Sequence, residues 1–486
     1  MSSNKVDNIT SSENGVAINL TVAQATAANL NKLSEANTIA VTGTSTEVNA
    51  SLAALLSSTK VDSITSSENN VAINLTVAQA TAANLDKLSV DNTIVVTGTS
   101  TEVNANLVTL LSSAKVDSIT SSENDVAINL TVAQATALNL DKLSVDNTIV
   151  VTGTSTEVNA SLADLLSSNK VDNITSSENG VAINLTVAQA TAANLDKLSV
   201  GNTIVVTGTS TEVNASLDDL LSSNKVDNIT SSENGVAINL TVAQATAANL
   251  NKLSEANTIA VTGTSTEVNA SLADLLSSTK VDTINSTDDS TPIVLNVSQV
   301  TSANLGKLVL GDTISLTDST ASLESALATL TGLQSTELEK IDSIDSTGNT
   351  LKLSAEQAAV LGSKLTAADV ITITNTLTQG DQSIAGGFQS GNDKLQFTAT
   401  ELTGATGFAA YGGGSGPTIT FTGGAAELVV STGGTLVASG AHAAFLFDTA
   451  TGELTFDADG TGTEAAIPVV TLTGVDTLAA ANLAFV

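Results

Sequence analysis

Residues 16–65 read VAINLTVAQATAANLNKLSEANTIAVTGTSTEVNASLAALLSSTKVDSIT, and the patterns in this stretch decide the fold. In VAINLT, apolar residues alternate with polar ones, which predicts a β-strand with one buried face. The residues on that predicted face are Val16, Ile18 and Leu20. The segments TIAVT at 38–42 and VDSIT at 61–65 predict two further strands, the second of them shorter.

Two helices are predicted in the same stretch, each beginning at a capping box. Thr21 stands three positions before Gln24, and Thr44 stands three positions before Glu47. We expect the first helix to run through about Leu33. Residues at helical spacing predict one buried stripe on each helix: Val22, Thr26, Leu30 and Leu33 share one face of the first, and Val48, Leu52, Leu55 and Leu56 form the apolar stripe of the second.

The stretch belongs to a repeat that recurs along most of the chain. Five units are nearly identical, a sixth drifts, and a shortened seventh lies at about 335–378. Each unit carries two lysines, as at Lys5 and Lys32 and again at Lys60 and Lys87, and this alternation continues without a slip to Lys307. Each unit therefore consists of two half-units of nearly equal length. The first six units span 3–57, 58–112, 113–167, 168–222, 223–277 and 278–332.

This period predicts an α/β repeat solenoid in which parallel strands stack and alanine-rich helices cover them. Neither helix of a unit can bury its apolar stripe alone, so neighbouring units have to supply the missing contacts. We expect the six full repeats at 1–332, the shortened repeat as a cap at 333–379, and an all-β C-terminal domain at 380–486. Whether one coil takes a half-unit or a whole unit is left open by the sequence.

Identical residues are expected to form ladders along the stack. We interpret the asparagines at Asn19, Asn29, Asn37 and Asn49 and their copies as turn and edge hydrogen-bonding groups. The lysines, which lie close to acidic residues, are interpreted as a solvated salt-bridging rim. In both cases the alternative is a ligand-contacting stripe. The rows TGTST, beginning at Thr42 and its copies, are candidate ligand contacts.

The composition excludes several classes of function. A formal charge of −33 repels nucleic acid and anionic lipid. The chain has no cysteine, and Thr, Ser, Gly or Asn interrupt every apolar stretch well before the ~18 residues that a membrane helix needs. We therefore expect no nucleic-acid partner and no transmembrane segment. The N-terminal residues show no Sec-type signal.

The C-terminal segment from Phe445 to Val486 carries an aromatic and aliphatic strand, the pattern D-x-x-T-G-x-L-x-x-D-x-D-G, an alanine-rich stretch and L-x-G before a short apolar end. This segment resembles the C-terminal region of RTX-type bacterial proteins exported by type I secretion. SGNDKLQFTATEL, at 390–402, is similar to a last, degenerate RTX repeat. The resemblance implies export without a Sec signal, the type I secretion machinery as a partner, and an extracellular or cell-surface location.

The resemblance does not extend to the calcium roll of RTX proteins. That roll needs tandem nonapeptides, and here Gly391, Asn392 and Asp393 form a single remnant. No cofactor is required by the sequence. Calcium remains a candidate ligand of the C-terminal domain, and its candidate ligands are Asp393, Asp448, Asp457 and Asp459.

No catalytic motif accompanies the single histidine, His442, so we expect a protein that is not an enzyme. The expected function is that of a secreted structural protein, which assembles with itself at the cell surface as an S-layer or filament by stacking of solenoid ends. The alternative is an adhesin or binding module that presents the threonine rows to a glycan or to ice, with cell-surface polysaccharide as a possible partner. The assembly candidates lie in the first unit: Val6, Ile9, Val16, Ile18 and Leu20.

Overall fold

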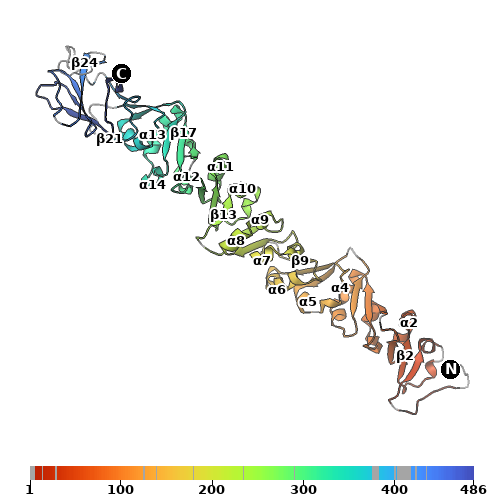
Figure 1. The fold of residues 1–486 in the computed structure, drawn as a ribbon. Helices are drawn as coiled ribbons and strands as arrows, with labels where there is room; N and C mark the ends of the chain where they lie inside the picture. Colours follow the sequence, from red (N-terminus) through yellow and green to blue (C-terminus); the bar gives the residue numbers. More distant parts are fainter. Residues whose placement is uncertain are drawn as a thin grey trace. The chain divides into compact units, whose positions relative to one another are not determined.

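The computed structural model describes residues 6–374, 382–398, 401, 418–421, 424–433 and 435–486, except positions 14, 28, 29, 70, 124, 125, 138, 179, 234, 289 and 290. It confirms the predicted fold class, because parallel strands and helices recur through the repeats and a β-rich part follows them (Figure 1). The chain divides into two compact units, the first reaching residue 234 and including Asn251–Ala256, the second formed by Gly235–Leu250 and residues from 257. None of the described helices is long and apolar enough to cross a membrane.

Each of the six full repeats begins a three-stranded parallel sheet, whose strands pair in the order of the sequence. In the first sheet, Ile18 is paired with Ile39, and Val41 is paired with Ile64. The sheets are β1–β3 (Ile18–Thr21, Ile39–Gly43, Ser63–Ser66), β4–β6 (Ile73–Thr76, Ile94–Gly98, Ser118–Ser121), β7–β9 (Ile128–Thr131, Ile149–Gly153, Asn173–Ser176), β10–β12 (Ile183–Thr186, Ile204–Gly208, Asn228–Ser231), β13–β15 (Ile238–Thr241, Ile259–Gly263, Thr283–Ser286) and β16–β18 (Ile293–Leu295, Ile314–Asp318, Ser343–Ser346).

The strand register answers the question of coil length. The partner of Val41 is Ile64, which lies in the next half-unit along the chain. A parallel bridge then joins Ile64 to Leu88, which lies one half-unit further on. The chain therefore returns to the sheet once per half-unit, and one whole repeat makes two turns of the coil.

The second helix of each unit forms as predicted. In α2, Thr44 accepts from the N–H of Glu47, whose carboxylate accepts from the N–H of Thr44, and the whole stripe of Val48, Leu52, Leu55 and Leu56 is buried. Burying each of these leucines contributes roughly 1.5–3 kcal/mol. These helices are α2 (Ser45–Ser57), α4 (Ser100–Ser112), α6 (Ser155–Ser167), the pair α8 (Ser210–Ala215) and α9 (Leu217–Ser222), α11 (Ser265–Ser277) and α13 (Thr320–Thr331).

The prediction of a first helix through Leu33 is wrong. α1 ends at Ala25, where the Thr26 hydroxyl donates to the carbonyl of Val22 (3.0 Å), and Thr26 is exposed. A helix from 22 to 33 would extend about 18 Å, whereas Leu33 has to return to a bridge with Ile9. Short helices and 3-10 turns occupy this half-unit: α1 (Val22–Ala25), α3 (Val77–Ala80), α5 (Val132–Ala137), α7 (Val187–Ala190) and α10 (Val242–Ala245), followed by η1 (Leu30–Lys32), η2 (Ala83–Lys87), η3 (Leu140–Lys142), η4 (Ala193–Lys197) and η5 (Ala248–Lys252), with η6 (Val297–Gln299) and α12 (Ser302–Lys307) in the sixth unit.

The shortened repeat continues into a four-stranded parallel sheet in the order β19-β20-β22-β28. Strands from both sides of position 380 thus share one sheet. Its elements are α14 (Ser335–Leu338), β19 (Thr350–Ser354), α15 (Ala355–Leu361), η7 (Gly362–Lys364), β20 (Val370–Thr374), β22 (Lys394–Phe397), η9 (Ala480–Asn482) and β28 (Leu483–Phe485).

A second, mixed sheet has the order β21-β27-β26-β25-β24-β23. Phe445 of this sheet packs on Phe397 of the four-stranded sheet, with ring centroids 5.3 Å apart. Not every part of this region is a strand: the segment TLVASG at 435–440 is irregular and lies in the crossover between β24 and β25, which are parallel. The strands are β21 (Gln382–Ala385), β23 (Thr418–Phe421), β24 (Gly424–Ser431), β25 (Ala444–Asp448), β26 (Glu453–Asp457) and β27 (Ile467–Thr473).

Candidate functional site

Two of the four asparagine ladders, those of Asn37 and Asn49, bind backbone groups of neighbouring coils, which confirms the predicted role for these two. Asn92 is buried; its Oδ1 accepts from the N–H of Ser66 (2.8 Å), and its Nδ2 donates to the carbonyl of Ile64 (3.0 Å). Asn49, on helix α2, donates to the carbonyl of Ala72 (3.0 Å) and accepts from the N–H of Asn74 (2.8 Å). These side chains hold one coil to the next. Asn29 lies outside the described residues.

The lysines, in contrast, are not mainly a salt-bridging rim. Lys60 does form an ion pair with Glu35, at 3.4 Å. Lys87, however, donates to the backbone carbonyls of Leu56 (3.0 Å) and Ser58 at the end of helix α2. A positive group on these carbonyls satisfies the free C-terminus of a helix and its dipole. The same pair of bonds recurs at the ends of α4, α6 and α9, where the donors are Lys142, Lys197 and Lys252.

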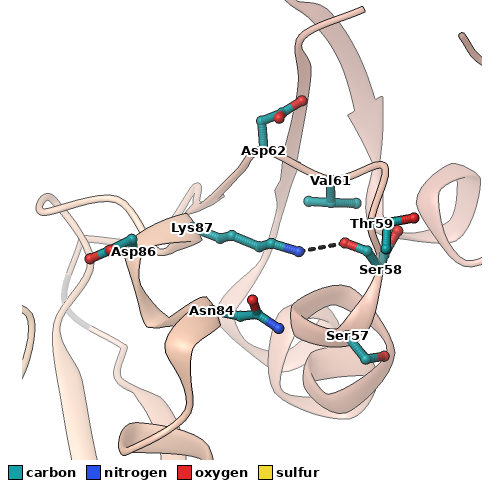
Figure 2. Close-up of a pocket in the computed structure, with 8 residues that line it drawn as sticks. All are labelled: Ser57, Ser58, Thr59, Val61, Asp62, Asn84, Asp86 and Lys87. Atoms are coloured by element: carbon teal, nitrogen blue, oxygen red, sulfur yellow. Dashed lines mark hydrogen bonds between the residues drawn. The ribbon is translucent and has the colours of Figure 1, made fainter. Parts of the chain in front are cut away.

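A pocket of about 440 Å³ lies beside this lysine (Figure 2). Ser57, Ser58, Thr59, Val61, Asp62, Asn84, Asp86 and Lys87 line it. Burial lowers the pKa of Lys87, while the nearby Asp62 carboxylate acts in the opposite direction. Asp62 also accepts from the N–H of Ile39 at the start of β2 (2.7 Å). Lysine and aspartate are therefore both engaged with backbone groups, and structure accounts for their presence in the pocket.

The threonine rows divide into structural and exposed positions. Thr99 caps helix α4, Gly98 packs so closely on Val77 that a Cβ would lie 2.5 Å from its side chain, and Ser100 is buried. Thr97, by contrast, is exposed on the sheet, paired in register with Thr76 and Thr120. The register thus brings three threonines side by side, of which only the middle one belongs to a TGTST row. The same triplets occur in the sheets β1–β3, β7–β9 and β10–β12.

The five assembly candidates differ in exposure. Val6 is 39% exposed, whereas its copy Val61 is 1% exposed, and Ile9 and Ile18 are half-buried although their copies Ile64 and Ile73 are fully buried. We call Val6, Ile9 and Ile18 the edge cluster. The other two candidates do not belong to it.

Val16 is 57% exposed, and its copies Val71, Val126 and Val181 are exposed as well, so the prediction that Val16 lies on the buried face of its strand is wrong. It precedes β1, whose first residue is Ile18. Leu20 is buried in the core of its own coil, as the strand pattern predicts, and so it is not exposed for contact with a second copy.

The four calcium candidates do not form one site. Asp393 is buried in the four-stranded sheet, where it accepts from the N–H groups of Ile371 (2.9 Å) and Gln389 (2.6 Å). Burial raises the pKa of Asp393, and these hydrogen bonds act against that shift. Both carboxylate oxygens therefore serve the backbone, and Asp393 is a structural residue.

Asp448 and Asp457 lie at opposite ends of the β25–β26 hairpin, because Asp457 is paired with Ala444 and Asp448 with Glu453. Hydrogen bonds from the N–H groups of Ala450 and Gly433 lower the pKa of Asp448. Asp457, the last residue of β26, and Asp459, in the turn that follows, are in contrast close in the chain, and both are buried. Among the described residues, no group of three or more His, Cys, Asp or Glu side chains is arranged to hold a metal ion.

Glu427 forms a buried polar pair that the sequence did not indicate. Its Oε2 lies 3.2 Å from His442 Nε2 and accepts from the N–H of Ser439 (2.9 Å). Burial favours a higher pKa for Glu427, but the hydrogen bonds from Ser439 and His442 outweigh it and lower the pKa. The pair attaches the crossover segment between β24 and β25, which carries Ser439 and His442, to strand β24. No local motif marks it, because the two residues meet only across this crossover.

No known protein-family model, curated protein or solved structure matches this chain. The resemblance of the C-terminal segment to RTX secretion regions therefore rests on its own residues and stays a prediction.

Proposed function

We propose that this chain is a secreted structural protein, not an enzyme, which assembles with copies of itself at a cell surface by stacking of solenoid coils. The observation that carries the proposal is the edge cluster of Val6, Ile9 and Ile18. In every later full repeat, the residues at these positions are covered by the preceding coil and are nearly or fully buried. In the first coil the same apolar side chains are partly open to solvent.

A second copy of the chain is the partner that fits this surface best. Inside the chain, the same positions are covered by a unit of almost the same sequence, since the first and fifth units differ only at Ala54 and Asp274. Apolar burial favours such a contact by roughly 25 cal/mol per Å² before the costs of association. A contact between two unlike surfaces of identical copies is heterologous, and it propagates into a filament or sheet when the rotation between copies does not close a ring.

The test is the substitution Ile9→Glu in the full chain. Burying an unpaired carboxylate against the neighbouring copy is costly, so we expect the concentration at which assemblies appear to rise by roughly tenfold or more. Val90→Glu is the matched control, because Val90 is 74% exposed and the first and fifth units carry Glu35 and Glu255 at its position. Light scattering over a concentration series measures the assembly of the two variants and of the wild type.

The wild-type chain and Val90→Glu should assemble alike. A wild-type chain that stays a monodisperse monomer at high concentration, with and without calcium, contradicts the proposal. So does an Ile9→Glu chain that assembles like the wild type.

Export is the part of the proposal that rests on the RTX-like segment from Phe445 to Val486. That segment supports the type I secretion machinery as a partner and an extracellular or cell-surface location. Expression with a type I exporter tests it: the intact chain should reach the medium, and removal of the segment 445–486 should keep it in the cell.

The in-register threonines favour a second candidate function, an adhesin or binding module. Neighbouring strands lie about 4.8 Å apart, so each triplet presents hydroxyl groups at a fixed spacing. Such an array suits a ligand that is itself periodic, such as ice or a surface glycan.

Substitution of Thr97, Thr152 and Thr207 by lysine separates the two functions. Lost ice or polysaccharide binding with unchanged assembly favours the binding module. Unchanged binding rules the threonine triplets out as its contact surface. Pull-down with the polysaccharide and ice-recrystallisation assays provide the two readouts.

A further inference from the structure

The end of strand β26 and the turn that follows it carry two buried carboxylates in a region with little positive charge. Asp457 is 7% exposed and Asp459 is 8% exposed. The sequence has no lysine after Lys394, and it has no arginine. His442 is therefore the one side chain after Lys394 that can carry a positive charge. The ring of His442 lies against Glu427. Buried carboxylates of this kind need hydrogen bonds or a cation.

Hydrogen bonds satisfy only part of this pair. Asp457 Oδ1 accepts from the N–H groups of Asp459 (3.2 Å) and Gly460 (2.8 Å). Asp459 Oδ2 accepts from the N–H of Glu464 (3.1 Å). The other oxygen of Asp459, Oδ1, is fully buried and has no hydrogen-bond partner among the described residues. An anionic oxygen enclosed without a partner is destabilising, and a bound cation would offset that cost.

The backbone around the turn brings further oxygen atoms close. Gly460, with φ +66°, lies so near the segment 440–442 that a Cβ would be 2.2 Å from the carbonyl oxygen of Gly440 and 2.4 Å from that of His442. At Gly462, a Cβ would lie 1.7 Å from Asp459 Oδ2. Both positions therefore require glycine: Gly460 because the turn packs closely on the segment 440–442, and Gly462 because it lies against the Asp459 carboxylate. The Gly440 carbonyl also accepts from the N–H of Thr461 (3.1 Å).

We propose that the turn Asp457–Glu464 binds one calcium ion, with Asp459 Oδ1 as its central ligand. Asp457 and the carbonyl groups of Gly440 and His442 are the further protein oxygens beside the turn, and water completes the shell. Calcium takes six to eight oxygen ligands in irregular geometry, including carboxylates and backbone carbonyls. Zinc prefers nitrogen and sulfur ligands, which this turn does not offer. The proposal is independent of self-assembly.

The test is a calcium titration of the full chain, measured by calorimetry. About 0.15 M KCl in the buffer screens weak binding to surface charges. We expect one site in the wild type. Asp459→Asn keeps the shape but removes the charge and one ligand oxygen, so its affinity for calcium should fall by roughly tenfold or more. Asp448→Asn is the control, since it removes the same charge at the other end of the hairpin.

Hydrogen exchange of the amides at 459–464 provides a second readout that needs no variant. Calcium should slow exchange there in the wild type and in Asp448→Asn. Unchanged exchange in the wild type overturns the proposal, as does equal calcium affinity of the wild type and Asp459→Asn. Equal protection by magnesium overturns the assignment to calcium.

Discussion

Most of the recurring polar residues of this chain serve its own backbone. Asn92 bonds to Ser66 and Ile64 of the preceding coil, and Asp62 receives the first N–H of strand β2. A hydrogen bond of this kind contributes most to stability where its loss would leave a buried backbone donor or acceptor without a partner. Coil-to-coil hydrogen bonding therefore explains why these polar residues recur from repeat to repeat, and no ligand is needed to explain it.

Asp369 offers a test of this interpretation, because it takes the place of the ladder asparagine in the shortened repeat. Ser346 donates its N–H to Asp369 Oδ2 (3.0 Å), as Ser66 does to Asn92. Burial raises the pKa of Asp369 above the ordinary value of 3.8. The folded state thus binds the proton more tightly than the unfolded state, so this group stabilises the fold at low pH and loses that contribution as pH rises through the folded pKa.

We predict that Asp369→Asn stabilises the second compact unit at neutral pH by about 1 kcal/mol, because the amide keeps the acceptor and removes the buried charge. The contribution of Asp369 to the stability of the wild type should grow as the pH falls from 7 through its raised folded pKa, and the variant should lose this part of the pH dependence. Urea unfolding at several pH values measures both effects. A variant that is less stable than the wild type at pH 7 contradicts the ladder role.

Sequence reasoning identified the buried face of the second helix but misplaced several single residues. Leu20 and Val16 both follow the alternating pattern, yet the strand begins only at Ile18 and Val16 is left exposed. The partner of Lys87 was also missed. It is the carbonyl of Leu56 in the preceding half-unit, and only the offset between half-units brings the two together.

The starts of the helices were predictable from their capping boxes, whereas the end of a helix that the coil limits was not. The Thr44–Glu47 capping box and the stripe from Val48 to Leu56 specify α2 locally. The helix after Thr21 has the same kind of start, but the return of the chain to the sheet at Leu33 stops it after one turn. Tertiary geometry here overrides a helical pattern.

Lys87 should matter to helix α2 as a C-terminal cap. We predict that Lys87→Met destabilises the chain by about 1 kcal/mol, because two helix-end carbonyls lose a charged donor that is only partly shielded from water. Lys60→Met is the matched control: Lys60 pairs with the exposed Glu35, and its loss should cost less than about 0.5 kcal/mol.

Hydrogen exchange at the end of α2 reports the local effect of these variants, since the N–H of Ser58 donates to the carbonyl of Ala54 in the last turn. Faster exchange in Lys87→Met alone supports the cap. Equal effects of the two substitutions would restore the salt-bridging interpretation.

The six full repeats share one set of contacts from coil to coil, so the stability of this part of the molecule is close to a sum over neighbouring units. The repeat period and the parallel stacking were evident from the sequence, because they need only recurrence and alternation. Coil length was not, since it depends on which strands pair, and the register alone shows a turn every half-unit. The edge cluster is where this repeated set of contacts is incomplete among the described residues.

Cryo-electron microscopy of the wild-type chain tests self-assembly most directly. We predict ordered filaments or sheets in which Val6, Ile9 and Ile18 of one copy are covered by a second copy, and we predict that Ile9→Glu abolishes them. Separate single chains at the highest soluble concentration, or ordered assemblies in which this cluster stays open to solvent, would contradict the account.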